Sequence, residues 1–140
     1  MKTMTLIAIG LVMAMVGLVG AGCKKKPPAQ DVASHHTPEG IYRTIQGLRL
    51  QLTAALEKKE LHYIHDSMYY FKDLCTALSA KLEGEQKQRV DAVLRELTGI
   101  AEEIDNSAGR GNQAATEANL QKLIDTLKEL EIEFKEDPKK

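Results

Sequence analysis

The chain of 140 residues contains no tryptophan, and its aromatic residues make up only 4% of the sequence. Cysteine is almost as scarce, since Cys23 and Cys75 are the only two. Two cysteines cannot supply the disulfide framework that stabilises many small secreted domains. The folded part of this chain must therefore be stabilised by its hydrophobic core.

Positive charge is not in excess either. From Thr37 to the last residue, Asp and Glu number 19, whereas Lys and Arg number 15. The basic surface typical of nucleic-acid-binding proteins is missing, so we expect no nucleic-acid partner.

Motifs that carry catalysis are absent as well. The sequence has no glycine-rich phosphate-binding loop, no nucleophile elbow and no zinc-protease helix. The glutamates at 102–103 and 129–133 have the spacing of solvated helix faces and not of an acid/base pair. We therefore predict that the protein is not an enzyme.

An uncharged apolar segment is the first distinctive feature that the sequence does contain. Lys2 provides a basic start, residues 4–22 carry no charge, and the segment ends in Gly-Ala-Gly directly before Cys23. A basic start, an apolar stretch and small residues at a cleavage site are the three parts of a secretory signal peptide.

This segment resembles the lipobox signal peptide of bacterial lipoproteins, in which small residues precede an invariant cysteine. Gly20 stands where that pattern usually has leucine. The resemblance implies that residues 1–22 are removed and that Cys23 becomes the lipidated first residue, with palmitate as a typical acyl group. The alternative is an uncleaved transmembrane anchor, because the apolar run approaches the roughly 20 residues that span a bilayer.

Both interpretations place the rest of the chain outside the cytoplasm and attached to a membrane. Lys24, Lys25 and Lys26 would add electrostatic attraction to anionic headgroups. Lys instead of Asp after the lipidated cysteine also resembles the signal that sends lipoproteins of two-membrane bacteria to the outer membrane. We therefore expect a cell-envelope location, on the periplasmic side of the outer membrane in preference to the inner membrane.

Residues 23–36 are predicted to form a flexible linker. Pro27 and Pro28 stiffen it, and its polar residues offer nothing to bury. His35 and His36 end the linker, where they could bind Cu(II) or Ni(II) loosely or simply be solvated.

Residues 37–137 are predicted to be all-α and to fold as an antiparallel up-down-up-down four-helix bundle. Thr37 and Pro38 suit an N-cap and a first helical turn. Gly84 is predicted to stop the second helix, and residues 106–111 are predicted to be a loop. Apolar residues recur at helical spacing in four segments, at about 38–58, 60–82, 85–105 and 112–135.

The predicted bundle resembles small exported four-helix bundles, many of which bind haem. The c-prime-type cytochromes attach haem through Cys-x-x-Cys-His, which this sequence lacks. The soluble b-type members use a methionine on the first helix and a histidine on the fourth, and neither segment here contains either residue. We therefore expect no haem.

The second helical segment has the side chains best suited to recognition. His62 and His65 are three residues apart and so share a helix face. Together with Met68 they offer nitrogen and sulfur donors that suit Cu, Ni or Zn. The simpler interpretation makes Met68 a core residue, His65 a packed residue beside the core and His62 a solvated one.

Three tyrosines in the same segment suggest an interface. Tyr63, Tyr69 and Tyr70 cannot all face the core, because the apolar seam already uses their neighbours. Exposed tyrosines are favoured at protein interfaces, although these could also pack beside the seam. The sequence thus favours a membrane-anchored module for protein interaction or envelope structure, with an unknown protein partner, over a metal-binding or metal-sensing lipoprotein.

Overall fold

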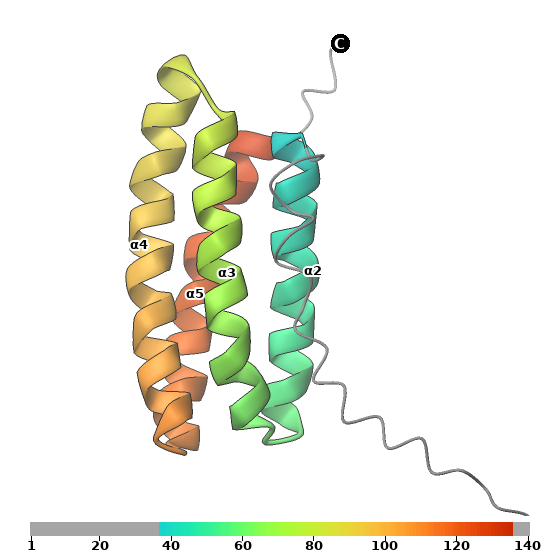
Figure 1. The fold of residues 1–140 in the computed structure, drawn as a ribbon, viewed down its shortest axis with the longest axis vertical. Coiled ribbons are helices and arrows are strands. Elements are labelled where there is room, and N and C mark those ends of the chain that lie inside the picture. Colours follow the sequence, from blue (N-terminus) through green and yellow to red (C-terminus); the bar gives the residue numbers. More distant parts are fainter. Residues whose placement is uncertain (1–36, 136–140) are drawn as a thin grey trace, which may run out of the picture.

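The computed structural model describes residues 37–135, which form four helices and contain no strand. The helices are α2 (Pro38–Glu57), α3 (Leu61–Lys81), α4 (Gly84–Gly109) and α5 (Gln113–Phe134). Successive helices run antiparallel, and α5 returns beside α2 (Figure 1). The predicted all-α bundle is confirmed, while the predicted signal peptide and linker lie outside the described residues.

Two of the helix starts follow directly from side-chain caps. Thr37 Oγ1 accepts a hydrogen bond from the Gly40 amide at 3.1 Å, and Asn112 Oδ1 accepts one from the Ala115 amide at 3.1 Å. Each bond satisfies one of the amides that have no partner within the first turn of a helix. Pro38, directly after the first cap, lacks an amide hydrogen and fits this turn.

The loop predicted at 106–111 is wrong, because α4 continues to Gly109. Ser107 and Ala108 are buried, and the Ser107 hydroxyl accepts a hydrogen bond from Thr116 Oγ1 of α5 at 3.1 Å. Burial against α5 thus outweighs the weak helix propensity of this Asn-Ser-Ala-Gly sequence. The chain turns at Gly111 instead, where φ is +70°.

Gly84 separates α3 from α4 as expected, but it does so as the first residue of α4. Its φ of +62° lies in the left-handed region that glycine adopts without strain.

The core receives side chains from all four helices and consists mainly of Leu, Ile, Val and Ala. The predicted seam of α3 is confirmed, since Ile64, Met68, Phe71 and Leu78 have no exposed surface and Cys75 is 3% exposed. Phe71 is the largest fully buried side chain, which makes it the central packing residue of the bundle.

Within residues 37–135, no helix combines the length and apolar character needed to cross a bilayer.

Candidate functional site

Helix α3 carries every site residue that the sequence predicts within the described part of the chain. The structure divides these residues according to the neighbouring helix that each one contacts.

His65 is fixed to α4 by Asp105. Its Nδ1 lies 2.7 Å from Asp105 Oδ1 and 3.2 Å from the Asp105 carbonyl oxygen. The Nδ1 N–H is directed at the carbonyl oxygen, and the buried Asp105 Oδ1 lies close to it without an aligned hydrogen bond. Gly109 lies against the same ring, since a Cβ added there would come 3.2 Å from Nδ1. His65 therefore belongs to the α3–α4 contact, in agreement with its interpretation as a packed histidine.

His62 is a surface residue. Its side chain is 85% exposed, and Nε2 lies 3.3 Å from Asp66 Oδ2, one helical turn further along α3. An exposed pair of this kind contributes little to stability. The His62 and His65 ring centroids are 6.3 Å apart.

Met68 does not join the two histidines on the surface. It lies in the core with no exposed area, so an ion arriving from solvent has no access to its sulfur. Within residues 37–135, no three His, Cys, Asp or Glu side chains converge to hold a metal ion.

The three predicted interface tyrosines do not form one patch. Tyr69 is 59% exposed and packs edge-on against His65, with ring centroids 6.2 Å apart. Tyr63 is 43% exposed, but its hydroxyl donates to Gln51 Oε1 of α2 at 3.1 Å. Tyr70 is half-buried against the core, and this burial raises its pKa. Tyr69 is therefore the tyrosine on the α4 side of α3.

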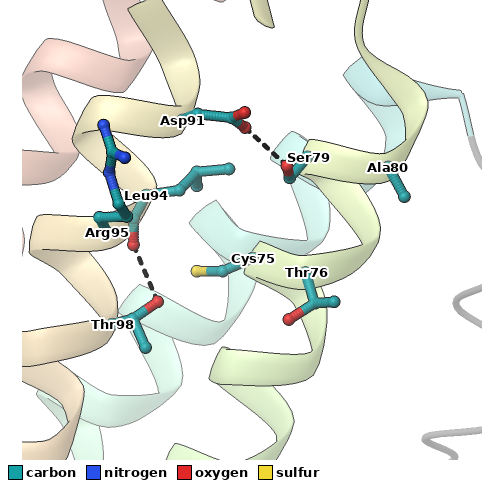
Figure 2. Close-up of a pocket in the computed structure, with 8 residues that line it drawn as sticks. All are labelled: Cys75, Thr76, Ser79, Ala80, Asp91, Leu94, Arg95 and Thr98. Carbon is teal, nitrogen blue, oxygen red and sulfur yellow. Dashed lines mark hydrogen bonds between the residues drawn. The ribbon is translucent and has the colours of Figure 1, made fainter. Parts of the chain in front are cut away.

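A hollow of about 530 Å³ lies between α3 and α4, and sequence reasoning did not predict it. Figure 2 shows Cys75 of α3 and Leu94 of α4 pointing into this space. Burial raises the pKa of the Cys75 thiol to about 12, against a smaller lowering effect from a hydrogen bond with Thr98. The thiol is therefore protonated and acts as an apolar wall, not as a nucleophile.

A polar clasp between α3 and α4 closes one end of the hollow. Ser79 Oγ donates to Asp91 Oδ1 at 2.6 Å, as drawn in Figure 2. Lys87 Nζ lies 3.1 Å from Asp91 Oδ2 and donates to the Ser79 carbonyl oxygen at 2.7 Å and to Ser79 Oγ at 2.8 Å. The Ser79 hydroxyl is a donor to a carboxylate and its neighbouring lysine is ion-paired, so this cluster joins helices and does not form a nucleophile.

The neighbours of Asp91 in this clasp shift the pKa of its carboxyl group. The Ser79 hydrogen bond, followed by the contacts with Lys87 and the charge of Arg95, lowers the pKa of Asp91 in spite of partial desolvation. Sequence spacing could have indicated the Lys87–Asp91 pair, which is i,i+4 on one helix. It could not indicate Ser79, which comes from the preceding helix.

Lys72 and Arg95 form no direct ion pair within residues 37–135, although the charge of Arg95 acts on Asp91. Lys72 Nζ lies 5.1 Å from the Tyr69 ring centroid, and Arg95 lines the hollow from α4. We define the α3–α4 face by Tyr69, Lys72, Cys75, Leu94 and Arg95. It combines an exposed aromatic ring, an apolar hollow and two cations.

The chain matches no protein-family model, and neither a curated protein nor a solved structure is significantly similar to it.

Proposed function

We propose that this protein is a membrane-anchored extracytoplasmic lipoprotein whose bundle acts as a protein-interaction or envelope structural module. Its docking surface is the α3–α4 face. The observation that carries this proposal is that one helix, α3, presents both Tyr69, which is 59% exposed, and the Cys75 wall of the hollow. An exposed, rigid aromatic side chain and a concave apolar surface are both typical of protein interfaces.

The chemistry of the face indicates what the partner presents. An apolar side chain of the partner would fill the hollow over Cys75 and Leu94. Carboxylates of the partner would pair with Lys72 and Arg95, neither of which makes a direct ion pair among the described residues. The partner is therefore a protein segment with apolar and acidic side chains next to each other.

The topology supports access to this face from outside the membrane. An even number of antiparallel helices puts the start of α2 and the end of α5 at the same end of the bundle (Figure 1). From Cys23 to Thr37 the chain can span at most about 45 Å, compared with a bundle length of about 30 Å for a 20-residue helix. A lipid anchor at Cys23 would join the bundle at this end, and a linker of this reach would allow the α3–α4 face to meet a partner.

Site-specific photo-crosslinking in the native membrane tests the docking surface. A photo-reactive benzoylphenylalanine replaces Tyr69 in one variant and Leu50 in the control, because Leu50 is 61% exposed but lies on α2. We expect one discrete crosslinked product from position 69, weakened by Arg95→Glu, and none from position 50. Products that are equal at both positions, or absent at position 69, would contradict the proposed face.

The anchor is tested separately by Cys23→Ser. We expect wild-type protein to incorporate radiolabelled fatty acid and the variant to remain as an unprocessed, unlabelled precursor. A wild-type protein without label, or with a mature N-terminus elsewhere, would contradict the lipoprotein assignment.

A further inference from the structure

We propose that His62 and His65 form a binding site for a borderline divalent metal ion, with Cu(II) bound most tightly, and that Asp105 is its positioning residue. This site does not depend on the docking function proposed above. Its residues are not those that define the α3–α4 face, although His65 packs against Tyr69 at the border between the two.

The orientation of His65 is the first observation. Two acceptor oxygens of Asp105 lie within 3.2 Å of Nδ1, so the ring proton must be on Nδ1. The neutral ring then has its lone pair on Nε2, which makes no hydrogen bond to any residue from 37 to 135. Metal-binding histidines characteristically donate the other ring N–H to a carboxylate or carbonyl in this way, which fixes the ring and increases its basicity.

The freedom of His62 is the second observation. Its ring centroid lies 6.3 Å from that of His65, on the same face of the helix. Metal–nitrogen bonds of about 2.0–2.1 Å need the rings somewhat closer. Because His62 is 85% exposed and has one surface contact with Asp66, it can rotate toward Nε2 of His65 at little cost. Asp66 is itself 61% exposed, so its carboxylate can supply an oxygen ligand, and water completes the coordination.

The donor set selects the metal. Two imidazoles with a carboxylate and water suit Cu(II), Ni(II) and Zn(II), and affinity for such sites is highest for Cu(II). Soft ions such as Cu(I) are disfavoured, because the sulfur of Met68, one turn along from His65, is buried. With only two nitrogen ligands, we expect a dissociation constant on the order of micromolar.

The experiment uses the full chain in detergent micelles, with His35→Ala and His36→Ala introduced to remove the linker histidines. Cu(II) is titrated against a glycine competitor and followed by electron paramagnetic resonance. We expect one equivalent to bind with nitrogen hyperfine structure. His62→Ala and His65→Ala should each weaken binding at least about tenfold.

The Asp105→Asn variant tests whether Asp105 orients His65 for metal binding or only stabilises the fold. The main-chain carbonyl of residue 105 still accepts the Nδ1 proton in this variant, so the fold should remain, as circular dichroism would show. We expect about tenfold weaker Cu(II) binding together with a changed hyperfine coupling. Lack of one-equivalent binding in the linker-histidine background would overturn the site, as would binding that His62→Ala leaves unchanged. An unchanged spectrum and affinity in Asp105→Asn would overturn the role of Asp105.

Discussion

The α3–α4 edge and the α2–α5 edge join antiparallel helices around the same core, but they do so with different chemistry. At the α3–α4 edge, Asp105 contacts His65 and Asp91 contacts both Ser79 and Lys87. These two polar contacts leave a hollow between them.

At the α2–α5 edge, aromatic packing replaces the ion pairs. The rings of Tyr42 and Phe134 stack with their centroids 4.8 Å apart and an interplanar angle of 9°. Further along this edge, Gln113 Nε2 donates to the Leu56 carbonyl oxygen at 3.2 Å. The comparison shows that one aromatic stack and one hydrogen bond join α2 to α5, whereas contacts between charged groups join α3 to α4.

The largest expected loss of stability comes from a substitution in the core that both edges share. Phe71→Ala should lower the free energy of unfolding by about 3 to 5 kcal/mol, because Phe71 is fully buried and leaves a cavity. Chemical denaturation followed by circular dichroism measures this change. A loss below about 1 kcal/mol would show that the two edges, and not the common core, stabilise the bundle.

The Cys75 thiol at the α3–α4 hollow should make the protein less stable as pH rises above 9. Its pKa is about 12 in the folded protein and 9.0 when unperturbed, so the unfolded chain loses this proton first. Stability should therefore fall by about 1.4 kcal/mol per pH unit from pH 9 toward pH 12. Denaturation at pH 8 and pH 10 measures the fall, and Cys75→Ala is the control in which this component should disappear.

The aromatic stack tests the α2–α5 edge alone. Phe134→Ala should cost about 1 to 2 kcal/mol through lost ring stacking and partial burial. Because no charge is involved, the loss should be the same at low and high salt. Ile132→Ala is the matched control, since Ile132 is 70% exposed on the same helix and should change stability by less than about 0.5 kcal/mol. A marked dependence on salt would contradict the apolar description of this edge.

The smallest effect is expected from Asp91→Asn, which removes the charge of the clasp. The pKa of Asp91 is lowered in the folded protein, so its stabilising effect is present above the ordinary value of 3.8 and is lost as pH falls below it. The variant should therefore show a flatter acid-unfolding curve below pH 3.8 than the wild type.

Asp125→Asn provides the comparison, because the pKa of Asp125 is also lowered but its partners Lys128 and Gln121 lie on the same helix. If the two variants flatten the curve equally, the clasp has no special role in joining α3 to α4.

The helices themselves could be predicted, because the signals that define them are local. Apolar residues at helical spacing located all four helices, and Thr37 located the start of α2, whereas the Asn112 cap of α5 was not predicted. The sequence pattern also identified the buried side of α3 and the exposure of His62. The end of α4 could not be predicted, because Ser107 and Ala108 are helical only through their burial against α5.

The sequence by itself determined the helical class, the core face of each helix and the candidate anchor at Cys23, since periodicity and short motifs are properties of neighbouring residues. Only the tertiary structure decided which polar side chains of different helices are in contact. Ser79 and Asp91 are 12 residues apart and His65 and Asp105 are 40 apart, yet both pairs are in contact. The same packing separated Tyr69 from Tyr63 and put Cys75 opposite Leu94, because the rotation and spacing of adjacent helices depend on how all their side chains fit together.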